Sequence, residues 1–179
     1  MKELALHILD IAQNSIRAGA RDIRITLSEQ LFSDWLEIII ADNGCGMDEL
    51  TLEKAADPYY TSRTTRKVGL GLSLLKMNAE LAGGTMTIKS EKGIGTTVTA
   101  TFRYSHVDRP PMGDLSGTVA LLISGNPSIN FIYEHILNAN RWTISTSEIK
   151  EVLGESSVSD IHIVRHLKEL IDENIADLK

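Results

Sequence analysis

The sequence predicts an α+β fold, on three observations. Near the N-terminus, over about residues 3–17, apolar side chains recur at helical spacing. Strand-like segments with alternating or continuous apolar residues follow at 22–27 and 35–41, and again at 85–89 and 96–103. A helix, a hairpin and two more helices are predicted beyond residue 114. A chain of 179 residues is long enough for one full domain and a small appendage.

Composition narrows the class of protein. Hydrophobic residues make up 42% and charged residues 23% of the chain, as in ordinary soluble domains. The net charge of −6 disfavours nucleic acid as a partner held by bulk charge. Cys45 is the only cysteine, which excludes an intrachain disulfide and a cysteine metal cluster. The longest apolar run, 36–41, contains Glu37 and is too short to span a bilayer, and the amphipathic N-terminus does not resemble a signal peptide, so a cytoplasmic location without membrane association is expected.

The first predicted helix carries a polar stripe opposite its apolar one. The stripe consists of His7, Asp10, Asn14 and Arg17, whose spacing points them the same way. A solvated helix face is the ordinary interpretation. The functional alternative is that the Asn14 amide oxygen completes the shell of a Mg²⁺ bound to phosphate and water. Asp10, one turn earlier, would then orient an attacking water.

A second motif, Asp42-Asn43-Gly44-Cys45-Gly46-Met47, follows the buried strand 35–41. Asn-Gly after a strand is a hairpin signal, but residues 47–50 look like a helix start with acids in its first turn. Glycines let a backbone approach a flat ligand, and Asp42 can accept a hydrogen bond from an exocyclic amine. Cys45 is expected to be a small residue of the pocket wall.

A third motif opens the helix predicted over 70–81, with Gly69 and Gly71 at its start. Free backbone N–H groups at such a terminus bind phosphate, although a glycine turn that eases the chain into a helix is the simpler interpretation. The third glycine of a dinucleotide fingerprint is missing, and no P-loop motif occurs in the sequence. Residues 57–68, just before this motif, are predicted to form a surface loop.

Taken in order, these motifs and the Gly-Thr-Thr at 95–97 resemble the signature of the gyrase, chaperone, histidine-kinase and mismatch-repair (GHKL) ATPases. The resemblance covers roughly residues 1–104. It implies the Bergerat ATP-binding fold, a two-layer α+β sandwich with helices on one face of a mixed sheet. The short stretch from Asp42 to Gly69 favours the histidine kinase and anti-sigma-factor kinase branch, although residues 13–20 are closer to the mismatch-repair version.

The resemblance also implies site roles. Asp42 would bind the adenine amine with help from Thr96, and Gly44, Gly46 and Met47 would belong to the same ATP-binding loop. Asn14 would hold Mg²⁺, and Asp10, where hydrolysing members carry Glu, is the candidate general base; its shorter side chain predicts slow hydrolysis. Phosphates would be bound by the backbone of Gly69, Leu70, Gly71 and Leu72, and by lid residues of the segment 57–68, namely Tyr60, Thr61, Arg63 and Lys67.

The rest of the chain matches no motif. Residues 105–114, with Pro110 and Pro111, are predicted to be a linker between the ATP-binding domain (1–104) and a small, mainly helical module with a hairpin (115–179). A winged-helix-like arrangement is conceivable, but the acidic charge favours protein docking or lid bracing over DNA binding. His162 and His166 have metal-clamp spacing but lack a further ligand in the expected place, which favours a surface helix.

The predicted function is binding of Mg-ATP in signal transduction, by a stand-alone kinase or ATPase that acts on a partner protein. Thirteen residues precede Asn14, too few for a phosphoacceptor hairpin, and His7 is expected at the pocket edge or surface. Whether ATP is hydrolysed or its phosphate transferred is left open. The alternative is a non-catalytic, nucleotide-sensing subunit whose lid and C-terminal module form an ATP-dependent docking surface. A protein that keeps the fold without the ligand is disfavoured by the intact motifs.

Overall fold

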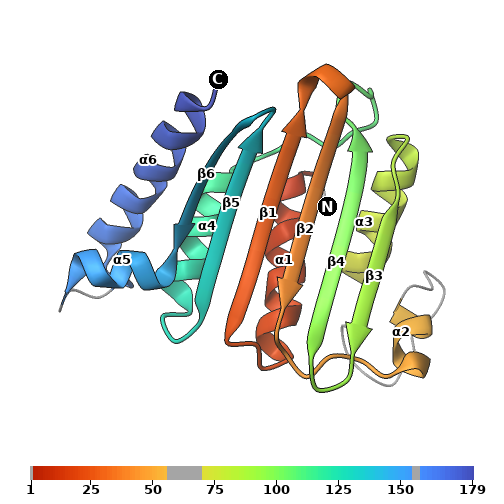
Figure 1. Cartoon of the computed structure of the whole chain (residues 1–179), viewed down its shortest axis with the longest axis horizontal. Helices are drawn as coiled ribbons and strands as arrows, with labels where there is room; N and C mark the ends of the chain where they lie inside the picture. The colour runs from red at the N-terminus through yellow and green to blue at the C-terminus, as the bar shows by residue number, and fades with distance from the viewer. Residues whose placement is uncertain (1, 56–69, 155–157) are drawn as a thin grey trace.

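One mixed sheet organises the protein (Figure 1). The computed structural model describes residues 2–55, 70–154 and 158–179, and within them the sheet has six strands in the order β3-β4-β2-β1-β5-β6. Their bounds are β1 (Asp22–Gln30), β2 (Trp35–Asp42), β3 (Met86–Glu91), β4 (Gly95–Arg103), β5 (Asn130–Leu137) and β6 (Asn140–Ser145). Neighbouring strands are antiparallel except β1 and β5, which run parallel. The predicted α+β fold with a mixed sheet is confirmed.

Helices cover one face of this sheet, as Figure 1 shows. The helices are α1 (Leu4–Arg17), α2 (Glu49–Ala55), α3 (Leu70–Leu81), α4 (Leu115–Gly125), α5 (Thr146–Leu153) and α6 (Ile161–Asp177), with a 3-10 turn η1 (Leu31–Ser33) between β1 and β2. The strands alternate accordingly: β1 buries Ile23, Ile25 and Leu27 under the helices, while Arg24 and Thr26 point to the other face and stay at least partly exposed. No helix within the described residues is long and apolar enough to cross a bilayer.

The C-terminal segment extends the same sheet. β5 pairs with β1 over eight register positions, including Ile25 opposite Tyr133, and the hydrophobic core runs without a break from α1 to α6. The segment predicted as a linker lies against the start of α1, where the backbone N–H groups of Leu4 and Ala5 donate to Pro111 and Met112 at 2.9 Å each. The predicted hairpin is therefore one edge of the main sheet, and α4 and α6 continue the helical layer.

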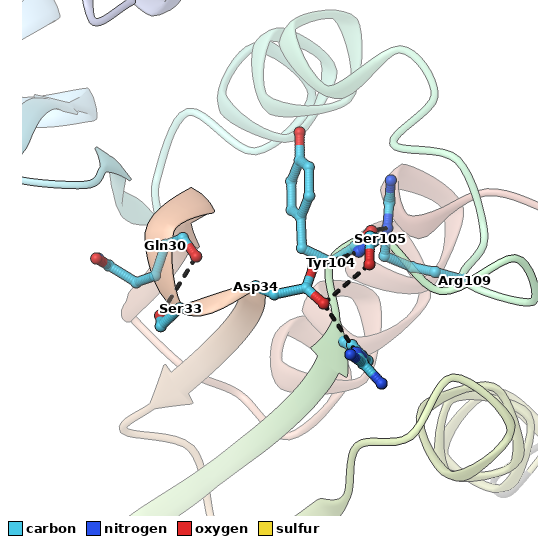
Figure 2. A network of polar contacts seen from close by, with 7 residues as sticks. Gln30, Ser33, Asp34, Tyr104, Ser105 and Arg109 are labelled. Carbon is cyan, nitrogen blue, oxygen red and sulfur yellow. Dashed lines mark hydrogen bonds and ion pairs between the residues drawn. The ribbon is translucent and has the colours of Figure 1, made fainter.

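A polar network joins the turn between β1 and β2 to the segment that follows β4 (Figure 2). Asp34, with φ of 56°, turns the chain from η1 into β2, and its carboxylate accepts from Arg103 Nε and from the Ser105 N–H and hydroxyl, each at 2.8 Å. These hydrogen bonds lower the pKa of Asp34. The guanidinium of Arg109 lies 4.9 Å from the ring centre of Tyr104, and its Nε donates to the Tyr104 carbonyl. The β1–β2 turn is thereby tied to the chain that leaves β4.

A buried polar group also joins β1 to β5. His135, 2% exposed, contacts the Tyr133 hydroxyl through Nδ1 at 2.7 Å and Glu29 Oε1 through Nε2 at 2.8 Å. Burial acts to raise the pKa of Glu29, but hydrogen bonds from His135 and Tyr104 and the charge of Arg109 outweigh it, so the pKa is lowered. The parallel strand pair is thus held by directional contacts as well as by apolar packing.

Candidate functional site

A pocket of about 290 Å³ lies where β2 ends and β4 begins, next to α1, α2 and α3. The residues predicted for nucleotide binding that line it are Asn14, Asp42, Gly46, Met47, Leu72 and Thr96. Ile11, Val98 and Leu72 give it an apolar floor. A concave, mainly apolar space with a few polar groups is typical of a small-molecule site.

Two hydrogen bonds fix the orientation of the Asp42 carboxylate in this pocket. It is the last residue of β2 and pairs with Thr96 of β4. Its Oδ2 accepts from the Ser15 hydroxyl at 2.6 Å, and its Oδ1 accepts from the Gly44 N–H at 2.9 Å. Each carboxylate oxygen has a second lone-pair direction, so the group can also accept from a ligand amine. Helix α1 and the loop after β2 therefore fix a carboxylate that still has acceptor capacity.

The loop after β2 is built by close backbone contacts. Gly46 has φ of 60°, and a Cβ there would lie 2.0 Å from the Glu91 carbonyl oxygen. A Cβ on Gly95 would lie 1.9 Å from the Asp42 carbonyl oxygen. The Met47 N–H donates to Ser90 Oγ at 2.8 Å, and Ser90 also contacts Thr96 Oγ1 at 2.8 Å. Only glycine at these two positions lets the loop lie against the β3–β4 turn.

Asn43, in the middle of the same motif, points away from the pocket. Its Oδ1 accepts from the N–H groups of Arg21 and Asp22 at 2.9 Å each, and its Nδ2 donates to Asp22 Oδ2 at 2.8 Å. These three hydrogen bonds hold the start of β1 next to the end of β2. The chain then continues to α2 and forms no hairpin, as the helix-like pattern of 47–50 predicts.

Asn14 and Asp10 occupy successive turns of α1. Asn14 lines the pocket, and its Oδ1 accepts from Arg17 Nη1 at 2.8 Å. Asp10 lies against the start of α3, so closely that a Cβ on Gly71 would be 1.7 Å from Asp10 Oδ2. The glycine at the start of α3 thus leaves room for the carboxylate. Asn14 is thus among the residues that line the pocket and Asp10 is not, although an amide oxygen and a carboxylate are both ligand types suited to Mg²⁺.

His7, predicted at the pocket edge or surface, is instead buried, with 1% exposure. Its Nε2 contacts Asn78 Nδ2 of α3 at 2.8 Å. Because an amide NH₂ only donates, Nε2 accepts and the proton resides on Nδ1, which has no partner among the described residues. Burial lowers the pKa of His7 to about 4. The polar stripe of α1 therefore includes one buried residue, His7, at the contact between α1 and α3.

Several predicted residues lie outside the described part of the chain. These are the loop 57–68 with its Tyr60, Thr61, Arg63 and Lys67, and also Gly69. Leu70 begins α3 and is followed by the buried Gly71 and Leu72. The roles toward phosphate predicted for the loop residues and for residues 69–72 remain predictions.

Sequence reasoning missed Ser15 and Ser90 and gave Arg17 no role in the site. Ser15 is the only residue with a hydroxyl group among those that α1 buries, which are Leu4, Ala5, His7, Ile8, Ile11, Ala12 and Ser15. A lone hydroxyl in an apolar stripe, next to a candidate ligand residue, is a signal that could have found it. Ser90 carries no such signal, because its role depends on the β3–β4 register. Arg17 shared the polar stripe and proves to contact Asn14.

Comparison with known proteins gives a family match over the part of the chain that forms the pocket. The family described as histidine kinase-, DNA gyrase B-, and HSP90-like ATPase matches residues 2–106. The histidine protein kinase DivJ of Caulobacter vibrioides is 36% identical over 95 residues, which are 51% of this chain and 16% of that protein. A probable C4-dicarboxylate sensor kinase of Bacillus subtilis is 34% identical over 83 residues, 46% of this chain and 16% of that protein. The chain spans about a sixth of the length of these curated relatives.

Similarity of fold extends further along the chain than the family match. The crystal structure of the N-terminal domain of a DNA repair protein superimposes with a TM-score of 0.56, covering 80% of this chain and 52% of that one at 18% sequence identity. At that identity the likeness concerns the fold alone. The match over residues 2–106 includes every element that builds the pocket, and the chain belongs to the family of histidine kinase-, DNA gyrase B-, and HSP90-like ATPases.

Proposed function

We propose that the pocket binds Mg-ATP and that the protein acts on, or signals to, a partner protein as a kinase or ATPase of the histidine-kinase type. The observation that carries the proposal is the Asp42 carboxylate, held by Ser15 and the Gly44 N–H at the mouth of an apolar pocket. An adenine ring offers the matching groups, a flat apolar face and an exocyclic amine that donates. Thr96, opposite Asp42 in the β2–β4 register, would support the same edge of the base.

Asn14 would hold Mg²⁺ through its amide oxygen. That oxygen now accepts from Arg17, whose guanidinium would be available to the phosphates once the ion takes its place. Bound Mg²⁺ would screen the phosphate charge next to α1. Asp10, on α1 one turn from Asn14 and against the start of α3, would accept a proton from a water or a substrate hydroxyl.

Action on a partner fits the exposure of the histidines. His7 and His135 are buried, at 1% and 2% exposure. His162 and His166 lie on α6, at the opposite edge of the sheet from the pocket (Figure 1). The fifth histidine, His106, follows β4 at the end of that strand away from the pocket, and none of the five is among the residues that line the pocket. A transferred phosphoryl group would therefore need an acceptor other than these histidines, and we assign that role to a partner protein.

The proposal is tested by titrating the full chain with ATP, with and without Mg²⁺, beside Asn14→Ala. We expect Mg²⁺ to tighten binding by at least about tenfold in the wild type and to have little effect in the variant, because the ion loses its protein ligand. GTP, which presents a carbonyl where adenine has its amine, should compete poorly. Equal affinity for ATP and GTP would contradict the assigned base site.

A nucleotide sensor without turnover is the second candidate, favoured by one observation. The residue at the base position is an aspartate, one methylene shorter than glutamate, and it already contacts Gly71. Phosphate release by the wild type and by Asp10→Asn separates the two functions. A rate at least about a hundredfold higher in the wild type supports catalysis by Asp10, whereas equal rates with intact ATP binding support the sensor.

A further inference from the structure

An apolar groove of about 490 Å³ lies between α5 and α6, at the edge of the sheet opposite the nucleotide pocket (Figure 1). Its apolar lining comes from β6, α5 and α6: Ile144, Ile149, Val152, Leu153, Ile163, Leu167 and Leu170. Val152 is 87% exposed and Leu170 44% exposed. Branched aliphatic side chains on a solvent-facing groove are typical of a surface that another molecule covers.

The groove exists because its two helices pack in different directions. α5 lies on β5 and β6, whereas α6 packs on α4 and buries Leu167 and Ile171 there. Leu167 also lines the groove, and Ile163 and Leu170, four residues before it and three residues after it, lie on the same side of α6. The apolar side of α6 thus continues from the buried Leu167 to Ile163 and Leu170, which are only partly covered and remain available to a partner.

Charge around the groove selects the partner. Glu148, Glu169 and Glu173 line it, and none of the described lining residues is a lysine or an arginine. Glu148 is fixed by the capping box of α5, where its Oε2 accepts from the N–H and hydroxyl of Ser145 at 2.9 and 2.8 Å. Glu169 and Glu173 stand one turn apart on α6. A ligand that fills the groove therefore gains by carrying positive charge beside its apolar groups.

We propose that this groove binds an amphipathic helix of a partner protein, with aliphatic side chains in the groove and Lys or Arg residues against the three glutamates. The lining residues of α6 run from Ile163 to Glu173, about 15 Å of helix, which matches about three turns of a bound helix with anchors at i, i+3 or i+4, and i+7. The inference does not rest on the proposed function, because none of these residues lines the nucleotide pocket.

The test is fluorescence anisotropy of the full chain with a labelled amphipathic peptide of about 18 residues, five helical turns. The peptide has leucines at i, i+3 and i+7 spacing and lysines beside them. We expect saturable binding that weakens by at least about tenfold in Val152→Asp and in the double variant Glu169→Lys/Glu173→Lys, and that falls steeply as salt rises. The same peptide with Glu in place of Lys should not bind.

Val107→Asp is the matched control, because Val107 is 91% exposed and does not line the groove. It should leave the affinity unchanged. Val152 is so exposed that its substitution should leave the thermal unfolding temperature unchanged, so a loss of binding reports the surface. Failure of the lysine peptide to saturate, or equal binding by Val152→Asp, would overturn the proposal. So would a wild-type dimer that Val152→Asp dissociates, since the occupant would then be a second copy. ATP affinity, measured in parallel, tests the nucleotide site separately.

Discussion

The two edges of the sheet are built by different physical means. At the nucleotide edge, the loop after β2 and the β3–β4 turn approach so closely that a single added carbon at Gly46 or Gly95 would overlap a carbonyl oxygen. At the α5–α6 edge, structure rests on aliphatic packing, in which several residue types of similar size serve equally well. A site made by backbone contact leaves a readable motif in the sequence, whereas a surface made by packing does not.

The largest expected effect tests whether the two edges fold together. Phe131 of β5 is 1% exposed in the shared core, and Phe131→Ala should lower the free energy of unfolding by about 3–5 kcal/mol. Because β5 pairs directly with β1, both edges should unfold in one transition. Urea unfolding of Trp35→Phe and Trp142→Phe, which leave a single tryptophan on β6 or β2, follows each region by fluorescence. Loss of the β6 signal at lower urea than the β2 signal would show that the edges are separate units.

The next effect concerns the backbone contact itself. Gly46→Ala should weaken nucleotide binding by about a hundredfold, about 3 kcal/mol, because its Cβ would meet the Glu91 carbonyl oxygen and push the loop from the pocket. Gly93→Ala is the matched control: Gly93 also has a positive φ, 82°, but a Cβ there meets nothing within 4 Å. It should cost stability through backbone strain and leave affinity unchanged. Equal affinities in the two variants would mean that the contact does not shape the site.

A smaller effect is expected from the buried His7 between α1 and α3. Its pKa is about 4 in the fold, against 6.5 ordinarily, so the unfolded chain takes up a proton that the folded chain resists. Stability from this group is complete above about pH 6.5 and is lost as pH falls toward 4, by about 3 kcal/mol. Unfolding free energies of the wild type and His7→Gln between pH 7 and 4 should converge at the acid end. Parallel pH profiles would refute the assignment.

The smallest effect is expected at Gly71. In Gly71→Ala the new Cβ would displace the Asp10 carboxylate, and phosphate release should slow by about tenfold while ATP affinity changes little. Gly125→Ala, also in a helix but with nothing within 4 Å of its Cβ, serves as the control and should match the wild type. A Gly71→Ala protein that hydrolyses ATP at the wild-type rate would remove Asp10 from the reaction.

The local sequence pattern was enough to predict most helices and strands, including β2 and β4, which line the pocket. The helix predicted over 70–81 is α3 with the same bounds, since Gly69 and Gly83-Gly84 flank it in sequence. The parallel pairing of β1 with β5 could not be predicted, because strand periodicity says which residues face the core but not which strand lies beside it. His7 was misplaced for a similar reason: its burial depends on α3, and Asn78 is 71 positions away in sequence.

The assignment of the pocket to ATP is tested most directly by calorimetry. The full chain and its Asp42→Asn variant are titrated with a non-hydrolysable ATP analogue and Mg²⁺. We predict saturable binding to the wild type and at least about tenfold weaker binding to the variant, because an amide cannot accept from Ser15 and Gly44 on both of its terminal atoms as the carboxylate does. No binding to the wild type, or equal binding to both proteins, would contradict the assignment of this pocket to ATP.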